Sequence, residues 1–550
     1  MKFSLWEIAV TAIALVLAIP VFVILANVFV PAGDVWQHLY STVLSDYISN
    51  SLLLMLGVTI GSFLLGVTAA WLVSMTEFPG RKHFEWALLL PMAIPAYIIA
   101  YTYTGMLDFA GPLQTSLREI SGWGYGDYWF PEVRSLSGAA IMMTLVFYPY
   151  VYLLARAAFL SQSLCVLEVS RSLGNGPWRT FFTVALPLAR PAIIAGLSLV
   201  LMETLADYGT VQYFGVSTFT TGIFRTWYGL DNAPAAAQLA AILLLFVLVL
   251  LTLERYSRRK ARYHNTSRSQ HTLGRFRLKG WNKFAAILIC FSMLLFGFLL
   301  PAAQLAVWAI DTATDVIDER FISLVLHSLG LAASAAILAL IISLTLAYGR
   351  RLNPTPLIKS LVRISSMGYA VPGTVIAIGV IIPLGYLDNL IDSWMRTHFD
   401  YSTGLIFSGT IFALLFAYMA RFLAVSLHAV ESGMERITPS MDEAARSLGC
   451  RPAGILRKIH IPMLKSSVLT AVLLVFVDVL KELPATLILR PFNFNTLAVK
   501  VYELAADERL ADSSSAALAI VLVGIVPVII LNRSISGFTQ RSRSRHEDPA

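Results

Sequence analysis

Long runs of apolar residues without a charged side chain constrain this chain more than any other feature. Residues 233–253, APAAAQLAAILLLFVLVLLTL, form one such run. At about 1.5 Å per residue, a helix of this length spans a hydrocarbon core of roughly 30 Å. The 550 residues are 57% hydrophobic and 13% charged, which is more apolar surface than a soluble domain can bury. The chain is therefore predicted to be an integral membrane protein.

The apolar runs predict an all-α polytopic membrane protein with about twelve transmembrane helices. A β-barrel would need short alternating segments, whereas these runs are continuous and of helical length. The first run, from Ile8 to Val30, exceeds the apolar part of a typical signal peptide, so we expect it to be a retained helix. The spans are expected near residues 6–30, 50–75, 85–107, 136–160, 189–211 and 233–254, and near 284–308, 327–349, 364–387, 405–430, 465–489 and 514–532.

The distribution of Lys and Arg predicts the orientation. The connector at 255–283 carries ten basic residues, and basic loops stay on the cytoplasmic side of a membrane. With six helices on each side of this connector, both termini are expected in the cytoplasm. A nucleic-acid-binding role for the connector is disfavoured, because topology and attraction to anionic membrane lipid explain its charge. No nucleic-acid partner is expected.

A polar stretch occurs twice, which indicates a tandem duplication. Three pairs of identical residues are each separated by 275 positions: Glu168 and Glu443, Gly174 and Gly449, and Pro187 and Pro462. Weaker similarities occur at an offset of 277, such as Pro95 with Pro372. Six helices per repeat give both repeats the same orientation, so a pathway between them is expected. The expected organisation is a first half at 1–254, a basic linker at 255–283, a second half at 284–533 and a cytoplasmic tail at 534–550.

Each copy of the polar stretch is expected to form two short helices in a cytoplasmic loop. Gly174 and Gly449 allow the positive φ that a turn between the helices requires. Pro187 and Pro462 suit the first turn of the following helix, where a missing N–H costs little. A helix lying on lipid headgroups would also fit a single copy. Two copies at equivalent places favour a docking surface.

The stretch resembles the EAA loop of ABC importer permeases, through which a permease couples to its ATPase. The first copy departs from the pattern with Val169 and Ser170 in place of two alanines. The resemblance assigns ATPase coupling to Glu168, Gly174, Leu186, Pro187, Glu443, Ala444, Ala445, Gly449, Ile461 and Pro462. It implies two copies of a separate ABC ATPase that binds ATP and magnesium, and an external solute-binding protein. The chain itself has no P-loop motif, so no catalytic residue, cofactor or enzyme activity is expected in it.

One pair of carboxylates lies in the fifth predicted helix of each half. Glu203 and Asp207 are four residues apart, and Asp478 and Glu482 repeat them at the offset of 275. Residues at i and i+4 share one helical face, and acids within a membrane usually face a cavity or a partner. With Tyr208 they could line a substrate pathway and make transient contacts with a hard cation, which prefers oxygen ligands. In the alternative, Asp478 and Glu482 pair with a base such as Lys481, and the other two acids are solvated near the surface.

The sequence around these acids resembles the fused two-half permeases of bacterial ferric-iron ABC importers. The resemblance rests on ETLADYGTVQYFGVSTFTTGIFRTWYGLDN from Glu203 and KELPATLILRPFNFNTLAVKVYELAADERL from Lys481. It implies a multi-pass inner-membrane permease that moves ferric iron from a periplasmic iron-binding protein into the cytoplasm by alternating access. Permeases for thiamine, polyamines and other solutes share this architecture and remain alternatives. An ion-coupled secondary transporter would leave the two polar loops unexplained.

Overall fold

The computed structural model describes residues 5–124, 126–162, 170, 172, 174, 176–259, 275–435 and 437–544. Among them, ten helices are long and apolar enough to cross a membrane, and two bent helix pairs raise this number to as many as twelve. The β structure of the described residues is one parallel pair of two-residue strands, β1 (Thr76–Glu77) and β2 (Phe276–Arg277). The predicted all-α polytopic fold is confirmed.

Two compact units make up the chain. The first comprises residues 1–41, 222–244 and 315–503, and the second comprises residues 42–221, 245–314 and 504–550. Five helices contain a boundary between the units: α2 (Val35–Thr42), α12 (Phe219–Phe224), α13 (Ala233–Arg259), α15 (Leu300–Val316) and α25 (Leu497–Ala506).

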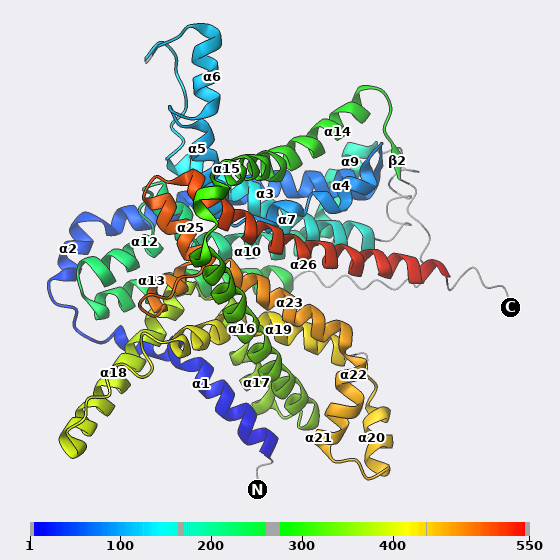
Figure 1. The fold of residues 1–550 in the computed structure, drawn as a ribbon. Helices are drawn as coiled ribbons and strands as arrows, with labels where there is room; N and C mark the ends of the chain where they lie inside the picture. The colour runs from blue at the N-terminus through cyan, green and yellow to red at the C-terminus, as the bar shows by residue number, and fades with distance from the viewer. Residues whose placement is uncertain are drawn as a thin grey trace. The chain divides into compact units, whose positions relative to one another are not determined.

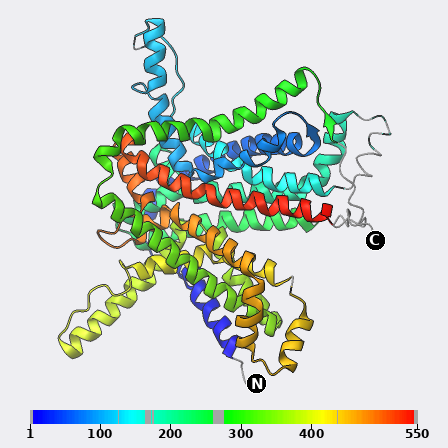
Figure 2. The same cartoon turned by 45° about the vertical axis from the view of Figure 1, so that its right-hand side comes forward.

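At the centre of the first unit, α16, α19 and α23 pack on one another, and α1 lies against α16, α17 and α18. Figures 1 and 2 both show α1, in blue, beside the green α16 and α17. Close approach requires small residues: Gly379 of α18 faces the backbone of Pro20, where a side chain would collide. The main helices of this unit are α1 (Leu5–Asn27), α16 (Glu319–Leu352), α17 (Pro356–Ser365), α18 (Gly373–Phe399), α19 (Ile411–Met434), α20 (Pro439–Ser447), α21 (Pro452–Ile455), α22 (Ile461–Met463), α23 (Lys465–Leu480) and α24 (Pro484–Leu489).

The second unit is built around α3, α7 and α10, with α14 packed on α3 and α4. Its α6, drawn in light blue, projects away from the other helices of the unit in Figures 1 and 2. The main helices are α3 (Leu44–Met75), α4 (Arg81–Ala87), α5 (Ala96–Leu107), α6 (Pro112–Ser121), α7 (Leu136–Ser161), α9 (Pro177–Thr180), α10 (Leu186–Ala206), α11 (Gly209–Tyr213), α14 (Trp281–Leu294) and α26 (Leu510–Ser544).

The compact units differ from the consecutive halves that the duplication suggests. The first helix of the chain packs with helices of the second repeat, and α14 packs with helices of the first. Hydropathy identifies a membrane helix but not its neighbours, because lipid and protein are equally apolar surroundings. Helices extend into the expected linker and tail, since α13 continues to Arg259 and α26 continues to Ser544.

Four predicted spans are wrong as single helices. One of them, at 364–387, is interrupted before Pro372, the repeat counterpart of Pro95. The span at 85–107 is interrupted before Pro95, which precedes α5, because proline has no N–H to continue the ladder. The span at 189–211 ends at Ala206, and the span at 465–489 breaks after Leu480. The last two breaks occur at equivalent places in the repeats.

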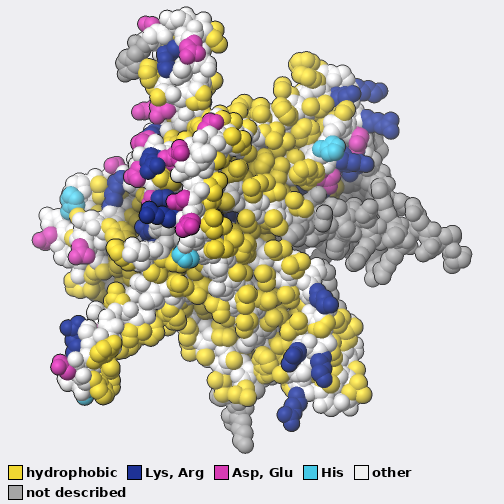
Figure 3. All heavy atoms as spheres, viewed as in Figure 1, with side chains coloured by type: hydrophobic (Ala, Val, Ile, Leu, Met, Phe, Trp, Pro, Cys, Tyr) yellow, Lys and Arg dark blue, Asp and Glu magenta, His cyan; other side chains and the backbone are white. Residues whose placement is uncertain are grey.

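Apolar side chains remain exposed along the flanks of the long helices. On α3, Leu56, Ile60 and Leu64 follow one another at four-residue spacing and are each more than half exposed. In Figure 3 hydrophobic side chains cover the helix flanks, while Lys and Arg gather near the start of α14 and over α20 to α22. Such an apolar stripe is costly in water but suits contact with lipid.

The close contact between α3 and α7 at Gly66 predicts that a larger side chain there destabilises the fold. A Cβ on Gly66 would lie 2.7 Å from Val151 Cβ and 2.8 Å from the carbonyl oxygen of Tyr148. Gly66→Ala should therefore lower the free energy of unfolding by about 1–3 kcal/mol. The matched control is Gly330→Ala in α16, where nothing lies within 4 Å of the added carbon. Unfolding of the purified chain in detergent, followed by intrinsic fluorescence, measures both, and equal stability of the two variants would contradict this packing.

Candidate functional site

The second copy of the repeated stretch forms a helix, a glycine turn and a second helical segment. α20 ends in a turn where the Gly449 N–H donates to the Arg446 carbonyl at 2.9 Å and the Cys450 N–H donates to the Ala445 carbonyl at 3.1 Å. Gly449 has φ +80°, as the sequence predicts. This pair of bonds is the Schellman arrangement that satisfies the last carbonyls of a helix.

An ion-pair cluster holds the two arms of this second copy together. Asp442 of α20 accepts a hydrogen bond from Arg351 at 2.7 Å and lies 2.6 Å from Nε2 of His460, on the far side of the turn. Arg351 also donates to the carbonyl oxygens of Met434 and Ile437 at 3.0 and 2.9 Å. The cluster is therefore a brace between the end of α16, the end of α19 and both arms of the loop.

The electrostatics of the brace keep Asp442 ionised. Burial raises the pKa of Asp442, but hydrogen bonds from Arg351 and His460 outweigh burial, so the pKa lies below its usual value. A lowered carboxyl pKa contributes stability above the unfolded value, and this contribution is lost as the pH falls through the folded value. The brace thus stabilises the loop at neutral pH.

Tyr348 completes the support of the second copy. Its hydroxyl donates to the carbonyl oxygen of Pro452 at 2.8 Å, and its ring meets the His460 ring edge-on at 5.2 Å between centroids. Tyr348, Arg351, Asp442 and His460 are not among the functional residues predicted from the sequence. Asp442 stands directly before Glu443, but nothing local to it indicates its two partners.

The first copy has the same backbone features where it is described. Glu168 lies outside the described residues, but Gly174 has φ +80°, equal to that of Gly449. Each copy then contains a five-residue π-helical segment at the same offset, η2 (Phe181–Ala185) and η6 (Leu456–His460). Such segments are rare and often occur at functional sites.

The residues after the π-helical segments differ from the prediction. Pro187 lies within one continuous helix that runs from Trp178 to Ala206, and Pro462 lies within one that runs from Pro452 to Met463, so neither proline begins a helix. Glu443 and Ala444 are exposed, whereas Ala445 is buried. Apolar side chains add to the exposed surface, with Trp178 72% and Leu448 83% exposed.

Aromatic packing replaces the ionic brace in the first copy. Trp71, which precedes Tyr348 by the weaker repeat offset, packs on Phe181 at 4.8 Å and on Phe159 at 5.6 Å between ring centroids. Ser170 and Thr180 share a hydrogen bond at 3.1 Å across the turn. Both copies therefore pack against an aromatic residue near the end of their second membrane helix. The two arms are joined by ring packing and a hydroxyl hydrogen bond in the first copy, and by ion pairs in the second.

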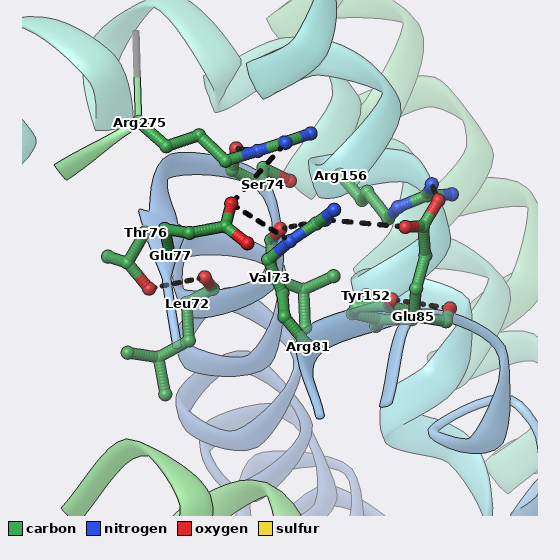
Figure 4. Close-up of polar contacts among 10 residues, drawn as sticks. All are labelled: Leu72, Val73, Ser74, Thr76, Glu77, Arg81, Glu85, Tyr152, Arg156 and Arg275. Carbon is green, nitrogen blue, oxygen red and sulfur yellow. Dashed lines mark hydrogen bonds and ion pairs between the residues drawn. The ribbon is translucent and has the colours of Figure 1, made fainter. Parts of the chain in front are cut away.

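A network of charged side chains, of which Arg81 and Arg156 are buried, lies beside this aromatic cluster, and Figure 4 shows it in close-up. Glu85 pairs with Arg156 and lies 3.3 Å from Arg81, whose Nη1 also donates to the Val73 carbonyl at 3.1 Å. Glu77 lies 3.4 Å from Arg81 and 3.5 Å from Arg275. The last described part of the basic linker is thus fixed to the end of α3 by β2 pairing with β1 and by Arg275.

Asp207 and Glu482 are helix caps rather than members of continuous helical faces. Asp207 accepts hydrogen bonds from the N–H groups of Thr210 and Val211 at 3.0 and 3.2 Å. Glu482 accepts from the N–H groups of Ala485 and Thr486 at 2.9 and 3.0 Å. The expectation that each pair shares one unbroken face is therefore wrong, because each carboxylate binds the start of the next short helix.

The other pathway candidates have separate surroundings. Asp478 lies 3.0 Å from Nζ of Lys481, the pairing that the structural alternative expects, and Glu482 pairs with Arg421 at 2.9 Å. Glu203 lies in α10 and Tyr208 is buried at the start of α11. Within the described part of the chain, no three His, Cys, Asp or Glu side chains converge in a way that could hold a metal ion.

The duplicated fold and its twin loops define a class of membrane transport proteins. Residues 62–263 and 339–544 each match the family described as the binding-protein-dependent transport system inner membrane component. The chain belongs to this family, and it is an ABC importer permease of the bacterial inner membrane, a transport component and not an enzyme. Permeases of this family work with an ATPase subunit and a periplasmic binding protein.

Individual relatives cover either most of the chain or about a third of it. The chain is 26% identical over 504 residues to the Fe(3+)-transport system permease protein of Haemophilus influenzae, covering 90% of this chain and 91% of that protein. It is 24% identical to the ferric transport system permease protein of Actinobacillus pleuropneumoniae, covering 88% and 70%. The molybdenum transport system permease protein of Haemophilus influenzae is 27% identical over 36% of this chain and 86% of its own length.

The glycine turn of the second loop can be tested with two neighbouring glycines. Gly449→Ala places a side chain at φ +80° and should weaken the end of α20 by about 1–2 kcal/mol. Amide hydrogen exchange over residues 444–450 should then become about tenfold faster. Gly454→Ala is the matched control, since Gly454 has ordinary φ and open space around it. Exchange that responds equally to both substitutions would argue against a strained turn.

Proposed function

We propose that this chain is the permease subunit of an ATP-driven ferric-iron importer. The observation that carries the proposal is the pair of loops with a glycine at φ +80°, a π-helical segment and a proline at matching positions. Two equivalent loops suit two copies of one ATPase, each copy binding one loop. ATP and magnesium belong to those ATPase subunits in this proposal, and this chain carries no cofactor.

The length of chain over which each relative aligns supports ferric iron as the cargo. The two ferric permeases align along most of this duplicated chain, whereas the molybdenum permease aligns with about one repeat. Permeases for other solutes nevertheless share the fold, so molybdate, sulfate, thiamine and polyamines are the competing cargoes. A periplasmic iron-binding protein would deliver the cargo, and both termini would lie in the cytoplasm.

Alternating access follows from the duplicated architecture in this proposal. ATP-driven closure of the ATPase dimer would move both loops, and the brace around Asp442 would transmit this movement to α16 and α19 because Arg351 joins all of them. In the first repeat, Trp71 and Phe181 would carry the same movement by ring packing. The repeats would then open the pathway alternately to each side.

Within the fifth helices, we propose a division of roles between the carboxylates. Asp207 and Glu482 hold the broken backbone through their capping bonds, whereas Glu203 and Asp478 are the pair proposed to contact iron transiently. Asp478 supports this role because its side chain is 19% exposed, compared with 1% for Glu482. Its partner Lys481 would be exchanged for the passing cation.

Uptake into proteoliposomes tests cargo and pathway together. Liposomes that contain the chain, its ATPase and its binding protein should accumulate labelled ferric iron with ATP, and should accumulate neither molybdate nor sulfate. Glu203→Gln with Asp478→Asn should lower iron uptake at least tenfold without changing protein level, since both changes keep shape and remove charge. The control, Asp34→Asn with Glu435→Gln, removes two exposed acids elsewhere and should transport normally.

The possible results separate the parts of the proposal. ATP-dependent uptake of another solute would reject iron and retain the importer. Unchanged iron uptake by the Glu203→Gln and Asp478→Asn variant would reject these residues as the pathway. Uptake that depends on an ion gradient and needs no ATPase would reject the importer itself.

A further inference from the structure

A basic pocket of about 310 Å³ lies in the first unit, at the junction of α16, α17 and α19. The last turn of α16 contributes Arg350, and α17 contributes Lys359 and Arg363, which are four residues apart on one face. His428 and Glu431 line it from α19. Ser360 adds a hydroxyl group that can donate a hydrogen bond, whereas the Ser366 hydroxyl already donates to the Arg363 carbonyl at 2.8 Å.

Positive charge in this pocket exceeds negative charge. Glu431 is its single acid and pairs with Arg350 at 2.6 Å. Lys359 and Arg363 are exposed, and neither side chain has an ion-pair partner among the residues that the structure describes. Two cations held about one helical turn apart are a suitable site for an anion with several oxygen atoms.

The corresponding region of the first repeat is closed by its own acids. Arg156 matches Glu431 at the repeat offset of 275, and Glu85 matches Val362 at the offset of 277. Glu85 pairs with Arg156 and Arg81, as Figure 4 shows, so that both of these arginines already have an acidic partner. The second repeat has an apolar residue in place of this acid, and its cations remain open to an external anion.

The surroundings of the pocket point to lipid as the source of that anion. α16 and α19 are both long and apolar enough to cross a membrane, and the pocket lies at their C-terminal ends. α17 presents Leu357 and Ile364, 60% and 46% exposed, on a stripe beside the basic face. An apolar stripe next to a basic pocket suits an acyl chain and its headgroup, whereas a free phosphate would gain nothing from the stripe.

We propose that this pocket binds the phosphate diester of an anionic phospholipid, with Lys359 and Arg363 as its main ligands and Arg350 as a third cation. Arg350 directly precedes Arg351, the centre of the brace that holds the second coupling loop. A lipid bound here would therefore lie beside the loop of the second repeat and not at the equivalent place in the first. The proposal does not depend on which solute the permease carries.

Native mass spectrometry of the purified full-length chain tests this site. Titration with phosphatidylglycerol should reveal one tight binding event that phosphatidylcholine does not reproduce. Lys359→Gln with Arg363→Gln should weaken that event by about 30-fold, the effect of removing two cations that contact one phosphate. The control, Lys82→Gln with Lys283→Gln, removes the same charge from exposed positions in the second unit and includes the repeat counterpart of Lys359.

Each outcome decides the proposal. Loss of the event in the first variant alone, with wild-type elution and thermal unfolding, supports it. Equal loss in the control variant, or no loss in either, overturns it. Displacement of the lipid by millimolar inorganic phosphate would identify a soluble anion as the ligand and reject lipid. Unchanged lipid binding with reduced copurification of the ATPase would reject it in favour of a protein partner.

Discussion

Backbone groups within a membrane must find partners inside the protein, and the breaks in the fifth helices depend on how this requirement is met. A break exposes the N–H groups of the next helical turn, and a carboxylate supplies them with acceptors in both repeats. Asp207 does so for α11, and Glu482 does so for α24. Asp207 and Glu482, which the sequence suggests as pathway residues, therefore have a structural role as helix caps. Arg421 and Thr486 complete the surroundings of Glu482, so that a charged group is tolerated where only 4% of the residue is exposed.

The duplication conserves backbone geometry more strictly than side-chain chemistry. Gly174 and Gly449 have equal φ, and the π-helical segments fall at matching positions. The contacts that support the loops differ, because Trp71 packs on Phe181 in one repeat and the Arg351, Asp442 and His460 brace serves the other. An aromatic cluster and a buried ionic brace can both hold two short helices at a fixed angle. The ionic brace depends on pH and on neighbouring charge, whereas the aromatic cluster does not, so the stability of the two loops can vary independently.

Unequal charge distribution extends this difference to the region behind the loops. Glu85 pairs with Arg156 and Arg81 in the first repeat, and Arg275 of the linker joins the same network through Glu77. In the second repeat, Val362 occupies the matching position and Lys359 and Arg363 face an open pocket. A fused chain can carry such asymmetry, since each repeat is free to vary by itself, whereas two identical subunits would carry the same site twice. The family assignment thus describes the shared scaffold, and the differences between repeats describe this chain.

Apolar runs, the offset of 275 and the spacing of Glu, Gly and Pro were enough to predict an all-α membrane fold, its duplication and the glycine turn in each repeated loop. These features are local: a membrane helix satisfies its own backbone, and a glycine turn is set by one residue. Tertiary structure decided which helices are neighbours, so that α1 joins the second repeat and α14 the first. It also assigned capping to Asp207 and Glu482, and it brought Arg351 to Asp442 from 91 residues away. These contacts depend on packing between distant segments, and hydropathy and local spacing carry no information about which segments meet.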